Sequence, residues 1–593
     1  MQNNIFKTSK MKFKYYRATR LLFIAGLLTG MVACSDFLDV EPREVVTAEN
    51  MYRDKNDANA IIRGIYGKFL TLAEQHVVLN ELRADLVDVT QNAHYYLQEI
   101  NAHAIPSADN PYADPVPYYE LINQCNDALW NFNKMYKELK LLKEDYNQRY
   151  SDIGTLRSWL YLQLVIQFGE VPYLTEPIES VNDIESIMEK APVLGIEEMV
   201  DSLVAFMERL PTYARYTDPE MRTSIDGYQM DVLFIDKMFF MGDLYLWDDN
   251  YYMAASMYKQ LMDLDIGRDN YDTYKIPQTF DLVAVDNYNS QYVRYNDWDV
   301  NSAINHWPYM FSTDDQDNDY FYEWIWVMEF DEIYKPTNPF FRLFSRTQGE
   351  YMLKPSQSVI DMWDSQIQYN DYAGDFRGNT GSYFMDSITF QTEITKYTSE
   401  FDILNPFNKS GKFMLMRAGQ LHLRYSEAAN RDGEYKIAYK LVNDGMRAYN
   451  PIPDSLVNVG GAVVEIYNRT LKPFPYDFDA LSSNSFHIPP LARDPWYRNG
   501  GIRGRVFLSN IEIPDGVDSL QSIEHMIIDE SALELAFEGH RWGDLVRIAI
   551  RENDPAYLAD KVYEKLQKGN HPEADEVHTK LMTRENWFLP LTK

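Results

Sequence analysis

The feature that most constrains the fold is a helical segment, residues 153–168, that must be buried on nearly every side. Its apolar residues lie around the helix rather than along one stripe: Leu156, Trp159, Leu160, Leu164, Val165, Ile166 and Phe168. A helix that is apolar all round is stable only inside a larger body. Gly169 and Pro172 follow it, which is the usual order of residues at a helix end. We therefore expect a helical protein with this segment in its interior.

Other helical patterns flank this segment along the chain. They cover residues 118–137, 196–210, 230–247, 252–263, 413–430, 434–448 and 522–550. Several form pairs with small residues at contact positions, such as Ala418, Gly419, Ala428 and Ala429. This pairing favours a degenerate tetratricopeptide-like array. A generic helical bundle fits equally well, because no stretch matches the strict repeat consensus.

Residues 271–410 differ from both helical blocks. They are rich in Asn, Asp, Tyr, Trp and Pro and contain few long periodic runs. A segment this long with little regular structure is either disordered or functional, and its aromatic content argues against disorder, because aromatic rings need packing partners. We expect ordered loops with short strands, such as residues 324–327, mounted on the helical scaffold.

The N-terminus has the pattern of an export signal. Six basic residues and no acidic residue precede an uncharged run, Leu21–Val32. A membrane span needs roughly 20 apolar residues, so this shorter run suits a signal peptide. The run ends in Met31-Val32-Ala33-Cys34, which is similar to a bacterial lipobox. Acyl chains such as palmitate on Cys34 would anchor the protein without a transmembrane helix.

Two alternatives remain open at this terminus. The signal could be an ordinary secretory one in which Cys34 is incidental, and translation could begin at Met1 or at Met11.

An acidic stretch follows the cysteine, with Asp36, Asp39 and Glu41.

Charge and cysteine content exclude several classes of function. The formal net charge is −33, and such a surface repels phosphate backbones, so we expect no nucleic-acid partner. The two cysteines, Cys34 and Cys125, are too few for a disulfide scaffold, an iron–sulfur site or a cysteine zinc site. We expect Cys125 to be a packed core residue.

Several short motifs occur in an order that is similar to one known family. They are Cys34–Asp39, Leu156–Tyr161 with Phe168–Pro172, Lys354–Ser356, Gly374–Arg377, Leu423–Asn430, Glu530–Leu545 and Trp587–Pro590. The chain thereby resembles the SusD/RagB family, surface lipoproteins of Bacteroidetes that hand nutrients to a TonB-dependent outer-membrane channel. It departs from the family pattern at Met31, Ser426, Ser531 and Gly543, where Leu, Ala, Arg and an aromatic residue are commoner.

The resemblance implies an all-α dominated, SusD-like fold in which degenerate tetratricopeptide helix pairs carry a loop-rich ligand-binding region with short strands. We divide the chain into a signal peptide (1–33), a lipid-anchored segment (34–60), a helical scaffold (61–270), the loop-rich region (271–410) and a C-terminal helical part (411–593).

The resemblance also implies a function and a location. The family is non-enzymatic and uses no cofactor, and its partner is a SusC-like TonB-dependent receptor. The acidic stretch after Cys34 resembles the family's surface-export signal, which implies lipid anchoring to the outer membrane with the body facing the exterior.

Two regions offer candidate ligand contacts. Glycan recognition needs flat apolar rings for sugar C–H faces and planar polar groups for hydroxyls. The middle region supplies Tyr295, Asn296, Trp298, Asn305, Trp307 and Tyr309, and an early loop supplies Asn92, Tyr95 and Tyr96. The alternative for each ring is that it packs the loops against the scaffold, which we favour for Trp324 and Trp326.

Sequence patterns for chemistry are weak. Asp315, Asp317 and Asp319 have the spacing of a calcium loop, but Tyr320 and Trp326 stand where Gly and Glu are needed, so we expect a solvated loop and no metal site. Glu530, Glu534 and Glu538 are four residues apart and would line one helix face, with Arg541 able to pair with Glu538. We expect structural roles for these carboxylates.

Four hypotheses follow. The first is a surface lipoprotein that binds an oligo- or polysaccharide and delivers it to the transporter. The second is oligopeptide capture in the same architecture, as in RagB-like proteins. More distant are a secreted glycoside hydrolase, whose paired carboxylates leave no local motif, and a purely structural lid.

Overall fold

The computed structural model describes most of the chain from residue 51 onward. It covers residues 51–263, 323–398, 409–446 and 499–591, apart from 179, 181, 183, 224–229, 332, 334, 515 and 517. It also covers the short pieces 307–308, 310–311, 455–459, 462–466, 472–478 and 496. Within these residues the fold is dominated by α-helices, and the strands pair only two by two.

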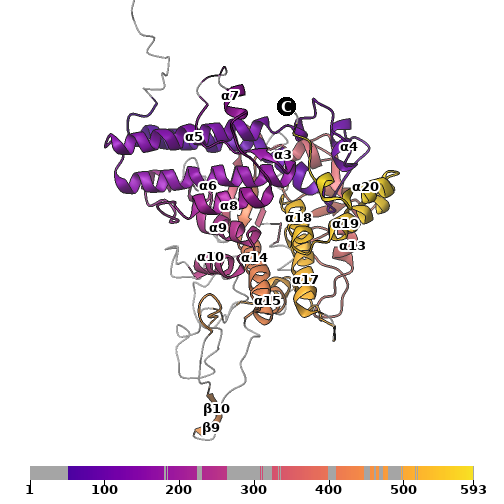
Figure 1. Cartoon of the computed structure of the whole chain (residues 1–593). Helices are drawn as coiled ribbons and strands as arrows, with labels where there is room; N and C mark the ends of the chain where they lie inside the picture. Colours follow the sequence, from indigo (N-terminus) through magenta and orange to yellow (C-terminus); the bar gives the residue numbers. More distant parts are fainter. Residues whose placement is uncertain are drawn as a thin grey trace, which may run out of the picture.

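The longer helices stack in consecutive pairs (Figure 1). Their bounds are α2 Lys55–Phe69, α5 Val116–Lys137, α6 Lys143–Phe168, α8 Ile196–Met207, α9 Lys237–Trp247, α10 Tyr251–Asp263, α14 Ala418–Arg431, α15 Tyr435–Val442, α17 Ser519–Glu534, α18 Arg541–Arg551, α19 Pro555–Lys568 and α20 Ala574–Leu581. Helix α5 packs on α6, α9 on α10, α14 on α15 and α19 on α20. The expected all-α dominated architecture of helix pairs is confirmed.

Shorter elements connect these pairs. The short helices are α3 Ala73–Val77, α4 Tyr95–Asn101, α7 Ile184–Met188, α12 Phe340–Phe344, α13 Gln357–Asp364 and α16 Ile502–Arg505. The strand pairs, all antiparallel, are β1 Val87–Val89 with β5 Leu353–Pro355, β2 Val171–Pro172 with β3 Val193–Leu194, β4 Trp324–Phe330 with β8 Gly411–Arg417, β6 Tyr383–Met385 with β7 Thr392–Ile394, and β9 Ser455–Val459 with β10 Ala462–Ile466.

Helix α6 is buried along most of its length, as its sequence predicts. Nearly every residue from Gln148 to Phe168 is buried, and the helix begins earlier than expected, at Lys143. It ends at Gly169, whose φ of 77° is unfavourable for residues with a side chain. A Cβ atom there would also lie 2.7 Å from the ring of Phe588, so glycine is required by both conformation and space.

Aromatic rings fill the centre of the molecule, which accounts for part of the aromatic content. Phe69 of α2 stacks on Trp326 of β4 at 5.3 Å between ring centroids. Trp159 of α6 meets Trp326 edge to face, also at 5.3 Å. Trp324 and Trp326 are 1% and 0% exposed, which confirms the packing interpretation of this strand. Cys125 is fully buried, as expected.

The predicted bounds of three helices were partly wrong. Residues 411–417 form strand β8, because they pair with β4 in the register Met328↔Phe413 and Phe330↔Gly411, and only then does α14 begin. The expected helix 522–550 is broken between Glu534 and Arg541. The expected helix 230–247 starts with a short 3-10 turn, Met230–Val232, and becomes α-helical only at Lys237. Tertiary pairing and turn geometry override the helical periodicity in each case.

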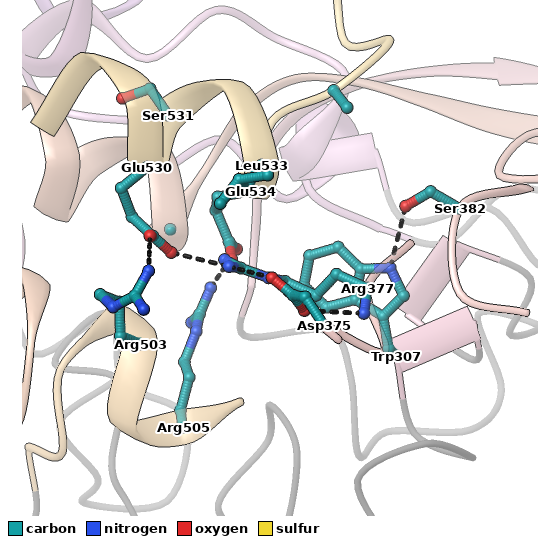
Figure 2. Close-up of polar contacts among 12 residues, drawn as sticks. Trp307, Asp375, Arg377, Ser382, Arg503, Arg505, Glu530, Ser531, Leu533 and Glu534 are labelled. Carbon is teal, nitrogen blue, oxygen red and sulfur yellow. Dashed lines mark hydrogen bonds and ion pairs between the residues drawn. The ribbon is translucent and has the colours of Figure 1, made fainter. Parts of the chain in front are cut away.

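Buried ion pairs join α17 to the neighbouring loops (Figure 2). Glu534 pairs with Arg377 and Arg417, each at 2.7 Å, and with Arg505. Glu530 pairs with Arg503 at 2.7 Å and Arg377 at 2.8 Å. Burial alone would raise the pKa of Glu534, but the guanidinium groups of Arg505, Arg417 and Arg377 hold it well below its ordinary value.

The expected pairing of Arg541 with Glu538 was wrong. Glu538 lies beyond the end of α17 and pairs with Arg417 at 2.8 Å and Lys396 at 2.5 Å. Arg541 instead binds both carboxylate oxygens of Asp85, at 2.7 and 2.8 Å. The break in the helix turns the two side chains to different neighbours. These carboxylates therefore hold the fold together, as expected.

In the part of the chain that the structure describes, the helices are too short or too polar to cross a bilayer. Cys34 and the signal segment lie outside the described residues. The five-part division of the chain stays a prediction.

Candidate functional site

The early loop and a middle loop, far apart in sequence, lie against each other. Strand β1 pairs with β5, with Asp88 opposite Lys354. Past the strand end, the Thr90 N–H donates to the carbonyl of Met352 at 2.9 Å, and the Asn92 side-chain amide donates to the carbonyl of Glu350 at 3.1 Å. The loop carrying Asn92 is therefore fixed to the segment before β5.

The β6–β7 hairpin joins the same face. The Tyr351 hydroxyl donates to the carbonyl of Thr392 in β7, and the Arg346 N–H donates to the Glu393 carboxylate at 2.9 Å. We call the surface made by residues 90–96, 346–352 and 383–394 the β-loop face. It unites the early loop with part of the predicted middle region, residues 271–410.

The hairpin presents apolar side chains to solvent. In β6, Tyr383 is 1% exposed and Phe384 is 46% exposed, because successive strand residues point to opposite sides. In the connecting loop, Ile388 and Phe390 are 87% and 74% exposed. Asp386 shapes this loop: its carboxylate accepts the N–H groups of Ile388 and Thr389 at 2.9 and 2.8 Å, which lowers the pKa of Asp386.

Tyr95 and Tyr96 form the aromatic part of the early loop. Their ring centroids are 4.0 Å apart at a tilt of 41°, and Tyr95 is 50% exposed. The Tyr96 hydroxyl donates to Asp109 at 2.7 Å. Hydrogen bonds with Tyr95 and Asp109 raise the pKa of Tyr96, and they hold the two rings in a defined orientation.

A second row of side chains supports this pair. The His94 ring stacks on Tyr112 at 6.1 Å and 13°. The Tyr112 hydroxyl donates to Glu74 at 2.7 Å, and Glu74 also pairs with Arg342. The Arg342 side chain is 43% exposed, so its guanidinium is partly open to solvent beside Glu74.

Asn92 is exposed, and together with Tyr95 and Tyr96 it can contact a ligand. Trp307 is fully buried; its indole N–H donates to Ser382 at 3.3 Å (Figure 2), so this ring packs in the core instead of facing a ligand. Tyr295, Asn296, Trp298, Asn305 and Tyr309 lie outside the described residues, as do the candidate calcium ligands Asp315, Asp317 and Asp319.

Sequence reasoning missed the β6–β7 hairpin. Its signal was present in Asp386-Ser387-Ile388-Thr389-Phe390, a turn between two short alternating runs that places apolar residues where turns are usually polar. No cluster of three or more His, Cys, Asp or Glu suited to a metal ion occurs among the residues that the structure describes.

A separate groove of about 960 Å³ lies at the C-terminal end of α4. It is lined by Ile100, Ile105, Glu197, Arg584 and Phe588, among others. It contains none of the residues predicted from the sequence, and its walls mix acidic and basic side chains. The β-loop face, in contrast, contains Asn92, Tyr95 and Tyr96, which were predicted from the sequence.

Comparisons with known proteins define the class of this fold. A SusD superfamily protein from Bacteroides vulgatus has a TM-score of 0.56 at 12% identity, over 91% of this chain and 96% of that chain. A SusD-like carbohydrate binding protein from Bacteroides fragilis has a TM-score of 0.52 at 13% identity, over 85% and 88%. A laminarin binding SusD-like protein has a TM-score of 0.51 at 13% identity, over 91% and 96%. The chain has the SusD-like fold.

Sequence comparisons agree with this class. Residues 500–593 match the model of the SusD family. SusD-like protein P2 of Formosa agariphila is 25% identical over 197 residues, which is 32% of this chain and 38% of that protein. The match thus spans well under half of the relative's length. The resemblance to the SusD/RagB family is confirmed.

Proposed function

We propose that this protein is a lipoprotein, acylated at Cys34 on the outer membrane and facing the exterior, that binds a glycan at the β-loop face and delivers it to a SusC-like TonB-dependent receptor. The observation that carries the proposal is the joining of residues 90–96, 346–352 and 383–394 into one surface with exposed rings. The description of some structural neighbours as carbohydrate binding supports it.

The chemistry of the face suits a neutral sugar chain. Tyr95, Phe384 and Phe390 offer flat apolar surfaces for sugar C–H groups, while the side-chain amide of Asn92 offers donors and an acceptor for hydroxyls. A net charge of −33 disfavours acidic ligands such as uronic-acid glycans. Neutral glucans are therefore the first ligands to test, and laminarin belongs in the panel because one structural neighbour is described as binding it.

Affinity electrophoresis and calorimetry against neutral and acidic polysaccharides, their oligosaccharides and mixed peptides test the proposal. We expect binding to at least one neutral glycan. Replacing an aromatic stacking platform typically costs on the order of 1–3 kcal/mol, so Tyr95→Ala and Phe390→Ala should each weaken that binding about 5- to 150-fold.

Tyr435→Ala is the matched control. Tyr435 is 43% exposed on α15, away from α4 in Figure 1, so its loss should leave affinity unchanged. Binding to peptides with none to glycans would favour oligopeptide capture in the same architecture. Equal losses in Tyr95→Ala and Tyr435→Ala would exclude the β-loop face as the binding surface.

A further inference from the structure

The connection between α5 and α6 exposes apolar side chains that the glycan-binding proposal does not use. Leu139 and Leu142 are 87% and 74% exposed, and Trp130 on α5 is 58% exposed. Figure 1 shows α5 and α6 side by side, joined at one edge of the molecule far from α4. Apolar residues gathered in this way on a soluble surface mark an interaction site more often than residues scattered singly.

The same region has a small excess of lysines in a strongly acidic protein. Residues 134–145 contain four lysines and three acids, a net charge of +1, whereas the whole chain carries −33. Lys140 pairs with Glu138 at 2.8 Å. Lys134, Lys137 and Lys143 are exposed and form no ion pair with the residues that the structure describes. We call Trp130, Lys134, Lys137, Leu139, Leu142 and Lys143 the α5–α6 tip.

The geometry aligns these groups on one rigid support. Positions 130, 134 and 137 are four and then three residues apart, so Trp130, Lys134 and Lys137 share one face of α5. At the base of the tip, Tyr136 stacks on Tyr146 of α6 with ring centroids 4.6 Å apart at 16°. Protein surfaces that lie in a membrane interface typically combine aromatic rings, lysines and leucines, as this surface does.

The start of the described chain lies against the tip. The Lys140 ammonium donates to the carbonyl of Tyr52 at 3.4 Å, and the Tyr52 hydroxyl donates to Asp127 of α5 at 2.6 Å. Residues 34–50 connect Cys34 to this point and can reach about 55 Å when fully extended. A lipid anchor at Cys34 would therefore be connected to the folded part of the protein beside the α5–α6 tip.

We propose that the α5–α6 tip docks on the anionic lipid surface that holds the anchor. Leu139, Leu142 and Trp130 would enter the headgroup region, and Lys134, Lys137 and Lys143 would face the lipid phosphates. The tether supplies a high local concentration of bilayer, so weak contacts suffice. This inference rests on the anchoring part of the proposed function and is independent of the ligand.

Fluorescence quenching of the acylated protein in phosphatidylcholine–phosphatidylglycerol vesicles tests the inference. A Leu139→Cys variant carries an environment-sensitive dye. Cys125 stays unlabelled because it is fully buried, and acylation blocks Cys34. An Ile388→Cys variant is the control, because Ile388 is also 87% exposed but lies on the β6–β7 hairpin. We expect nitroxide lipids to quench the dye at position 139 at least twofold and leave position 388 unaffected.

Charge reversal separates docking from tethering. The combined variant Lys134→Glu, Lys137→Glu, Lys143→Glu should lose the quenching at position 139 while keeping vesicle attachment. Equal quenching at positions 139 and 388, or no quenching at position 139, would overturn the proposal.

Mass spectrometry distinguishes this failure from failure of the proposed function. If Cys34 carries no acyl chain, the anchoring proposal falls. The same dye measurement with the unacylated protein, in which Cys34→Ser removes the second labelling site, then decides whether the tip binds anionic vesicles by itself.

Discussion

At the scale of single residues, buried charges bind α17 to the loops that surround it. Arg417 is fully buried and contacts three carboxylates, those of Glu323 at 2.9 Å, Glu534 at 2.7 Å and Glu538 at 2.8 Å. Those acids come from the residue just before β4, from α17 and from the turn that follows α17. Removing one partner of such a group leaves the others buried and uncompensated, which is much costlier than losing an exposed pair.

We therefore predict that Arg417→Met lowers the free energy of unfolding by roughly 3–5 kcal/mol. Urea denaturation followed by tryptophan fluorescence measures it. Arg53→Met is the control, because Arg53 forms an exposed pair with Asp57 at 2.9 Å, and it should leave the midpoint unchanged. A similar midpoint shift in both variants would show that the buried network is not cooperative.

At the scale of elements, one turn decides how the C-terminal helices pack. Between α17 and α18, Phe537 and Gly539 adopt φ values of 72° and 79°. The N–H groups of Gly539 and His540 donate to Glu81 at 2.7 and 3.1 Å. A Cβ on Gly539 would lie 2.6 Å from the His76 imidazole. The turn thus requires glycine for its conformation and for the close approach of α3.

Gly539→Ala should destabilise the fold by about 3 kcal/mol or more, because about 1–2 kcal/mol of left-handed backbone strain adds to a clash with a buried ring. Gly433→Ala separates the two contributions, since Gly433 has a φ of 89° but open space around its Cβ position. For Gly433→Ala we expect only the loss of stability that comes from left-handed backbone strain, about 1–2 kcal/mol. Thermal unfolding of both variants measures the difference, and equal losses would contradict the steric argument.

At the scale of the whole molecule, buried histidines couple folding to pH. Burial lowers the pKa of His76 to about 3 and that of His540 to about 4. In the unfolded chain both histidines have a pKa of about 6.5. Between pH 4 and 6.5 the unfolded state therefore binds more protons than the folded state, and the free energy of unfolding falls as the pH falls.

We predict a loss of about 1.4 kcal/mol per pH unit for each of these histidines below pH 6. Urea denaturation from pH 7 to pH 4.5 measures the slope. Asp152 and Asp243 contribute to it with the opposite sign, because burial raises the pKa of each to about 6, so the comparison with a histidine variant isolates the histidine part. His540→Gln removes one titrating group and should reduce the slope by that amount. An unchanged slope would show that His540 does not remain neutral in the folded protein.

Local patterns in the sequence predicted much of this architecture. The continuous apolar surface of residues 153–168 requires burial, and the Gly169 and Pro172 signals end the helix whatever surrounds it. Strand β4 followed from its alternation. Asn92, Tyr95 and Tyr96 were named as ligand contacts from residue type and from the resemblance to the family, and their role stays a prediction. The placement of Trp307 could not be predicted, because a ring in a polar stretch of sequence can face solvent or the core.

The sequence by itself determined that the protein is mostly helical and where α6 must lie, because periodicity and helix-ending residues act within a few turns of chain. The class of fold followed from the resemblance of its motifs to the SusD/RagB family, since periodicity alone left a generic helical bundle equally possible. Only the tertiary structure decided that residues 411–417 form a strand, that Arg541 binds Asp85, and that residues 90–96, 346–352 and 383–394 share one face. These outcomes depend on partners that lie 41 to 456 residues apart in the sequence, and the free energy of packing the whole chain decides which of them meet.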